Sequence, residues 1–92
     1  MRRMYIDQAA QDADKVAANI RAEISRRLLT QKELAERLEV ATSTLNRWLT
    51  QSDTLTVQNL IAISRALGVP PVSLFYEVPA LIDPEEPARL AE

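Results

Sequence analysis

The sequence predicts an all-α protein: a compact five-helix bundle followed by an irregular C-terminal tail. Apolar residues recur every three or four positions in stretches between residues 12 and 67, which is the spacing of amphipathic helices. Threonines suited to helix capping, Thr30 and Thr56, precede two of these stretches, and the single glycine, Gly68, follows the last. No strand-like alternation and no internal repeat is evident.

The composition excludes several classes of protein. The 92 residues are enough for one domain with one modest core. The chain has no cysteine and no histidine, and therefore no disulfide, no thiolate nucleophile and no usual zinc ligand set. No apolar run approaches the ~20 residues that span a bilayer, and the N-terminus does not resemble a secretory signal. We therefore expect an intracellular protein that is not an enzyme, with no cofactor and no metal.

The first predicted helix runs from Asp12 to Leu29, where nothing breaks a helix. Its apolar residues recur at every fourth position: Val16, Ile20, Ile24 and Leu28. The order of residues 1–11 is left open by the sequence. Thr30, with Glu33 three positions later, forms a capping box that starts a second helix from Gln31 to about Leu38.

A break at Glu39–Val40 separates this helix from a third, predicted from about Thr42 to Thr50 with Leu45, Trp48 and Leu49 as its apolar members. The polar residues 51–55 predict a loop. The fourth helix is predicted over 57–67, between the capping Thr56 and Gly68.

Pro70 and Pro71 can start a short fifth helix over 72–76, because proline suits the first turn of a helix. Residues 77–92 contain three prolines and an excess of acids, which favours an irregular or disordered tail.

Charge is distributed unevenly along the chain. The net charge is −2, which alone argues against a nucleic-acid partner. Residues 15–76, however, carry eight cations and five anions, whereas residues 77–92 carry one cation and five anions. A mild excess of cations supports nucleic-acid binding only if the cations share one face of the fold.

Three groups of residues share the spacing of a known family: Thr30, Gln31, Leu34 and Ala35; then Ser43 to Trp48 after a turn; then Ile63, Ala66, Leu67, Gly68 and Val69. This pattern resembles the Xre or Cro/phage-repressor helix-turn-helix family. The resemblance covers about Val16 to Tyr76, and it is specific because several spacings agree at once. It implies a lambda-repressor-like bundle in which the second helix crosses the DNA backbone and the third enters the major groove.

The resemblance also implies roles for individual positions. Thr42, Ser43 and Arg47 match positions that often reach base edges, and Thr44 and Asn46 match positions near bases or phosphates. Gln31 matches a phosphate contact at the start of the second helix. Ala35 matches the small residue that lets the two helices pack closely, and Leu45 and Trp48 match buried or half-buried positions.

Side-chain chemistry supports the same set of residues. Arg47 can pair bidentately with guanine and Asn46 with adenine. Gln31 and Lys32 stand at a helix N-terminus, where free N–H groups and the helix dipole favour a phosphate. We therefore expect base contacts from Thr42, Ser43, Asn46 and Arg47, and phosphate contacts from Gln31, Lys32 and Thr44.

Each of these residues also has an ordinary structural interpretation. Serine and threonine cap helices in all kinds of protein, and Asn46 or Arg47 can be a solvated surface residue. Trp48, between Leu45 and Leu49, is interpreted as a packing residue rather than as a platform for base stacking. The arginines of the first helix are expected to be solvated or paired with Glu23 rather than to extend a basic surface: Arg21, Arg26 and Arg27.

Three features depart from the family pattern. After Trp48 the family often has an acidic residue and then a glycine-containing turn, where this chain has Leu49, Thr50, Gln51 and Ser52. Glu39 occupies the turn position that is usually glycine, so it must adopt a positive φ or the turn must differ. Ala41 replaces the usual capping serine or threonine, which leaves open whether Thr42 caps the third helix instead.

The sequence thus predicts a DNA-binding domain at 12–76 and an acidic tail at 77–92. The leading hypothesis is a cytoplasmic regulator of transcription, a repressor or Cro-like switch of bacterial, phage or prophage origin. It would bind double-stranded operator DNA as a homodimer. The alternative is an antitoxin-like protein that binds a partner through its tail and binds DNA for autoregulation. An apolar run across the junction with the tail is a candidate dimer surface: Leu74, Phe75, Tyr76, Val78, Leu81 and Ile82.

Overall fold

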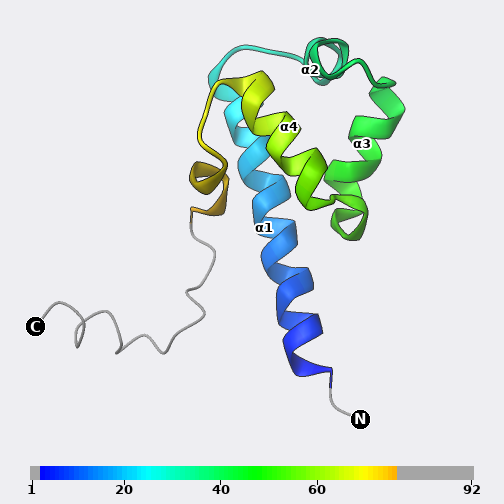
Figure 1. Ribbon diagram of the computed structural model, residues 1–92, viewed down its shortest axis with the longest axis vertical. Helices are drawn as coiled ribbons and strands as arrows, with labels where there is room; N and C mark the ends of the chain where they lie inside the picture. Colours follow the sequence, from blue (N-terminus) through cyan, green and yellow to red (C-terminus); the bar gives the residue numbers. More distant parts are fainter. Residues whose placement is uncertain (1–2, 77–92) are drawn as a thin grey trace, which may run out of the picture.

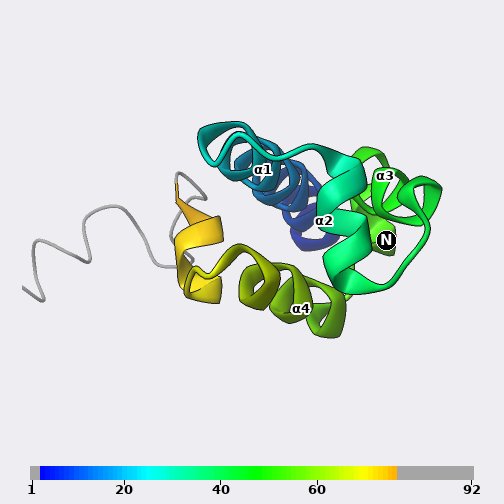
Figure 2. The same ribbon diagram turned by 90° about the horizontal axis from the view of Figure 1, so that it is seen from above.

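The computed structural model describes residues 3–76, which form four α-helices and two 3₁₀ helices and contain no strand. The elements are, in order, α1 (Met4–Arg26), α2 (Gln31–Leu38), α3 (Thr42–Thr50), η1 (Ser52–Thr54), α4 (Val57–Leu67) and η2 (Pro71–Phe75). Figure 1 shows α1 as the long helix; α3, η1 and η2 pack against it, whereas α2 packs on α3 and α4. Seen from above, α2 and α3 lie at one end of the molecule and η2 at the other (Figure 2).

One core holds these helices together. Its buried residues come from all four α-helices and η2: Val16, Ala17, Ile20, Ile24, Leu34, Ala35, Leu45, Leu49, Leu60, Ile63, Leu67 and Leu74. The predicted inward positions of the second, third and fourth helices lie in this cluster or pack against it. The all-α prediction is therefore confirmed for the part of the chain that the structure describes.

Helix α1 differs from its prediction at both ends. It begins at Met4, because the residues before Asp12 contain no proline or glycine to interrupt a helix. It ends at Arg26, three residues before the predicted Leu29. Leu28 takes a left-handed conformation with φ of 56° and is 89% exposed, so its expected place in the apolar stripe was wrong.

Two hydrogen bonds explain this ending. The N–H of Leu28 donates to the carbonyl of Ser25 (3.0 Å) and the N–H of Leu29 to that of Ile24 (3.0 Å). This left-handed cap satisfies the last carbonyls of α1 and turns Leu29 back towards the core.

Replacing Leu28 by glycine is expected to raise the free energy of unfolding by about 1 kcal/mol, because a left-handed residue with a Cβ is strained and this exposed side chain loses little packing. Urea denaturation followed by circular dichroism measures the change. The matched control is Ala18→Gly, inside α1 and exposed, which is expected to lower stability by about 0.5–1 kcal/mol. A loss of stability in Leu28→Gly would mean that the leucine side chain contributes a contact that outweighs the strain.

Helix α4 follows its prediction closely. The Thr56 hydroxyl accepts a hydrogen bond from the N–H of Asn59 (3.1 Å), and Gly68 closes the helix with φ of 75°. Two arginines then bind carbonyls at its last turn: Arg27 Nε donates to Leu67 (3.0 Å) and Arg37 Nη1 to Ala66 (3.1 Å). These arginines therefore complete the cap of α4 from two other parts of the chain.

The predicted fifth helix is a 3₁₀ helix, so residues 3–76 contain four α-helices and the predicted count of five is not confirmed. Its bonds are short-range: the N–H of Ser73 donates to the carbonyl of Pro70 (3.0 Å). The Asn19 side chain donates to the carbonyls of Leu74 (2.9 Å) and Tyr76 (2.7 Å), which ties the end of η2 to α1. The loop predicted at 51–55 contains η1. The predicted tail at 77–92 lies outside the described residues.

None of the helices in residues 3–76 is long and apolar enough to cross a membrane. Within the same residues, no three acidic side chains lie close enough together to hold a metal ion.

Candidate nucleic-acid interface

The start of α2 is held by the predicted capping box. The N–H of Glu33 donates to the hydroxyl of Thr30 (3.0 Å), and the N–H of Thr30 donates to the carboxylate of Glu33 (3.0 Å). Gln31 and Lys32 follow as the first two helical residues, Gln31 half-buried and Lys32 exposed. Both residues therefore stand where the N-terminal N–H groups and the positive end of the helix dipole favour an anion.

The sequence left two possibilities open for the turn after α2: a positive φ at Glu39, or a different turn. The structure has the first. Glu39 is left-handed, with φ of 59° and ψ of 41°. Its N–H donates to the carbonyl of Glu36 (3.1 Å), and the N–H of Val40 donates to that of Ala35 (3.0 Å). Val40 then packs against the core, so the turn sets the direction in which α3 leaves despite the strain at Glu39.

Helix α3 begins at Thr42 with Ala41 at its cap position, and no side chain caps it. The alternative in which Thr42 serves as the cap was therefore wrong. The carbonyl of Ala41 accepts from the N–H groups of Thr44 (3.0 Å) and Leu45 (3.1 Å), so the first turn is regular. Because no side chain makes a capping hydrogen bond, the first N–H groups of α3 have no side-chain acceptor.

The two faces of α3 differ sharply. Leu45 and Leu49 are buried in the core, and Trp48 is half-buried and packs against it. This placement agrees with the packing role predicted for Trp48. The outward positions are exposed and polar: Thr42, Ser43, Asn46, Arg47 and Thr50. Thr44 is only half-buried and lies between the two faces.

Helices α2 and α3 pack directly on each other. Leu34 and Ala35 of α2 are buried in the same cluster as Leu45 of α3. Ala35 is 1% exposed, which leaves no room for a larger side chain at this position. The two helices therefore form one rigid unit that carries all seven predicted contact residues.

Within residues 3–76, three of the six cations outside this unit are engaged by other groups of the protein. Arg26 and Arg27 form ion pairs with Glu23, one of the two interpretations offered by the sequence. Arg21 donates to the carbonyl of Leu49 at the end of α3, a role that sequence reasoning missed because residue 49 is distant along the chain.

Within residues 3–76, the side chains of Lys32 and Arg47 make no ion pair and no hydrogen bond. Both are exposed, and one belongs to each helix of the α2–α3 unit. They therefore keep their full donor capacity for an external anion or base edge.

The helix-turn-helix family model matches residues 20–74, which extend from the middle of α1 to η2 and include the whole α2–α3 unit. No curated protein and no solved structure matches the chain.

Proposed function

The chain belongs to the helix-turn-helix family of the Xre/Cro type, and we propose that it is a sequence-specific regulator of transcription that reads double-stranded DNA with α3 in the major groove. The exposed polar face of α3 carries this proposal. Ser43, Asn46, Arg47 and Thr50 recur at the spacing of one helical face, opposite the buried Leu45 and Leu49. A helix that reads the major groove must present polar side chains to the DNA while its inner face is held by the core, and α3 meets both requirements.

Each proposed base contact follows from side-chain chemistry. Arg47 would donate two hydrogen bonds to guanine, and Asn46 would exchange two with adenine. Thr42 and Ser43, at the uncapped start of α3, would contact bases or a thymine methyl group. The half-buried Thr44 would contact a phosphate.

Gln31 and Lys32 would hold the DNA backbone at the N-terminus of α2. A homodimer would then place two α3 helices in successive major grooves, with half-sites ~10 bp apart. Repression would come from occlusion of the promoter, as in a Cro-like switch. No observation on residues 3–76 favours the antitoxin-like alternative, whose motivating tail lies outside the described residues.

Replacing Lys32 by alanine is expected to weaken binding to all DNA sequences alike and to reduce the slope of log K against log salt by about 1. Fluorescence anisotropy over a series of KCl concentrations measures both quantities. Lys15→Ala, which removes an exposed lysine from α1, is the matched control and should leave the slope unchanged. Equal slopes for the wild type and Lys32→Ala would show that Lys32 does not contact a phosphate.

Selection from a random duplex library at near-physiological salt tests the proposed function as a whole. An enriched inverted repeat would support a dimeric sequence-specific regulator and would give its half-site spacing. An enriched single motif would support sequence reading by one copy and contradict the dimeric part. A folded protein that enriches no sequence would contradict the proposal.

A further inference from the structure

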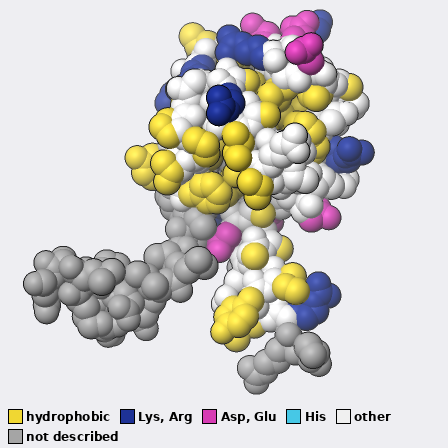
Figure 3. Space-filling model, in the orientation of Figure 1, with side chains coloured by type: hydrophobic (Ala, Val, Ile, Leu, Met, Phe, Trp, Pro, Cys, Tyr) yellow, Lys and Arg dark blue, Asp and Glu magenta, His cyan; other side chains and the backbone are white. Residues whose placement is uncertain are grey.

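The N-terminal end of α1 stands free of the bundle. Residues 4–11 are all exposed, and Figure 1 shows this end of α1 extending beyond the other helices. Ile6 is 59% exposed on this projection, and Figure 3 shows apolar side chains both on the projection and on the body beside it. A short helical stretch without packing is marginal in water, so an apolar surface of this kind calls for a partner.

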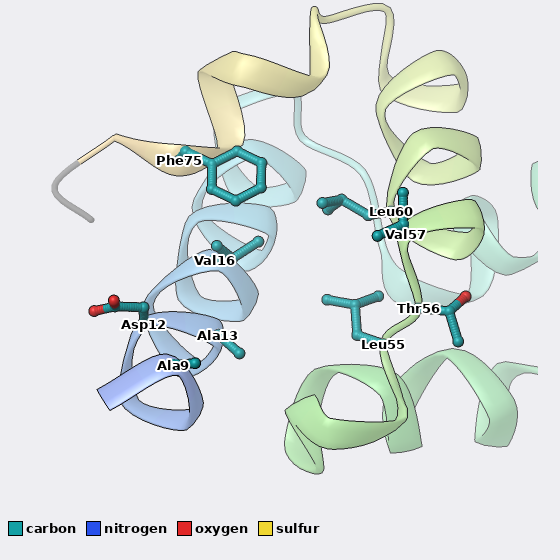
Figure 4. Close-up of a pocket in the computed structure, with 9 residues that line it drawn as sticks. All are labelled: Ala9, Asp12, Ala13, Val16, Leu55, Thr56, Val57, Leu60 and Phe75. Atoms are coloured by element: carbon teal, nitrogen blue, oxygen red, sulfur yellow. The ribbon is translucent and has the colours of Figure 1, made fainter. Parts of the chain in front are cut away.

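An open apolar groove of about 260 Å³ lies directly next to this projection. Figure 4 shows Ala9, Ala13 and Val16 of α1 facing Leu55 and Leu60 across it. Asp12 stands at the side of the groove on the same helix and, within residues 3–76, makes no ion pair. The groove therefore offers small and apolar side chains in its floor and a carboxylate at its edge.

The projection and the groove share one seam of α1. Ile6, Ala9, Ala13, Val16 and Ile20 follow one another at alternating spacings of three and four, which is the spacing of a helix that packs along another helix. Ile20 and Val16 are buried by the chain's own core. Further along the seam Ala13 is only half-buried, and Ala9 and Ile6 are exposed, so within residues 3–76 this half of the seam lacks a full partner.

We propose that the missing partner is the same half of α1 from a second copy, packed antiparallel about a two-fold axis between Gln8 and Ala9. In this register Ile6 of one copy lies between Ala9 and Ala13 of the other, a large side chain over two small ones. The contact is self-complementary, because each copy contributes the projection and receives that of the other.

The same register also matches hydrogen-bonding groups. Tyr5 and Asp12 lie on one flank of the seam, whereas Asp14, further round α1, accepts a hydrogen bond from Ser52 of its own copy (2.5 Å). A two-fold axis brings the flank of Tyr5 and Asp12 against the same flank of the other copy. The phenol of Tyr5 then meets the carboxylate of Asp12 of the other copy. A parallel pair would instead place the two positive helix ends together.

The dimer would leave the DNA-reading unit uncovered, because no residue that lines the groove belongs to α2 or α3. Its role in holding two copies on an operator rests on the proposed function, whereas the contact itself does not. The apolar run that crosses into the tail would then not be the principal dimer surface.

Sedimentation equilibrium of the full chain without DNA tests this contact. Ile6→Asp is expected to raise the dimer Kd by more than about tenfold, because it places a charge in the seam of each copy. Met4→Asp adds the same charge in the same turn on the opposite face of α1, at a residue that is 47% exposed, and should change Kd less than about twofold. Circular dichroism confirms that both variants remain folded.

A double-mutant cycle tests the register. Tyr5→Phe and Asp12→Asn are each expected to raise the dimer Kd about threefold, and the double variant should raise it little further, because both changes weaken the same hydrogen bond. A wild type that is monomeric at all accessible concentrations, or equal effects of Ile6→Asp and Met4→Asp, would overturn the proposal. A dimer abolished by removal of residues 77–92 but not by Ile6→Asp would assign the contact to the tail.

Binding to a single half-site separates this proposal from the proposed function. Ile6→Asp should weaken binding to a paired site while leaving binding to an isolated half-site unchanged. If the wild type enriches no DNA sequence and Ile6→Asp still dissociates the dimer, the proposed function fails and the α1 contact stands.

Discussion

Replacing Leu45 by alanine is expected to lower the free energy of unfolding by about 2–5 kcal/mol. Leu45 is fully buried on the inward face of α3 and lies in the same cluster as Leu34 and Ala35 of α2. The shorter side chain loses its transfer free energy and leaves a cavity that the close-packed helices cannot fill. Urea denaturation followed by circular dichroism measures the loss.

The matched control is Asn46→Ala, one residue along the same helix but exposed, which should change stability by less than about 0.5 kcal/mol. Small domains have total stabilities of roughly 5–15 kcal/mol, so Leu45→Ala removes a large share. Its DNA binding should fall only in proportion to the unfolded fraction and recover on cooling towards the temperature of maximum stability. Wild-type stability in Leu45→Ala would mean that α3 does not pack on the core through this residue.

Replacing Arg47 by alanine is expected to weaken specific DNA binding by about 1–3 kcal/mol, or about 5- to 150-fold in Kd, and to relax the preference at one base pair. The Arg47 side chain is exposed and makes no ion pair or hydrogen bond within residues 3–76, so its removal should leave the fold unchanged. Anisotropy titrations with the selected duplex and with single-base variants measure affinity and preference together.

Arg65→Ala is the matched control, because it removes one exposed arginine from α4, outside the α2–α3 unit. It should change affinity only slightly and leave the base preference intact. If Arg47→Ala keeps both the affinity and the preference of the wild type, the outward face of α3 does not read bases through this residue. A uniform loss across all sequences would instead make Arg47 a phosphate contact.

Local signals account for the parts of the fold that were predicted well. The capping box at Thr30, the capping Thr56 and the left-handed Gly68 each act within a few residues of the helix end that they define. The bounds of α2 and α4 therefore followed from short stretches of sequence. The positive φ of Glu39 was one of two outcomes expected, because the turn leaves few others.

Contacts between residues distant in the sequence account for the parts of the fold that were not predicted. The end of α1 depends on how Leu28 and Leu29 turn back to the core, and the tie between η2 and α1 depends on Asn19, which is more than 50 positions from its partners. The sequence also could not show that Arg21 and Arg37 bind the carbonyl ends of other helices. These bonds form only once the helices have been brought together.

The sequence by itself determined the helical class and the helix-turn-helix, because capping, turn and periodicity signals are local. Its resemblance to the Xre/Cro family gave the seven residues expected to contact DNA, which stay a prediction. Only the tertiary structure decided which cations are engaged in caps and ion pairs: within the α2–α3 unit Arg37 is engaged, and the side chains of Lys32 and Arg47 have no partner in residues 3–76. It also decided that the seam of α1 is buried at Ile20 and open at Ile6. The physical reason is the same in both cases: burial and pairing depend on which distant segments meet.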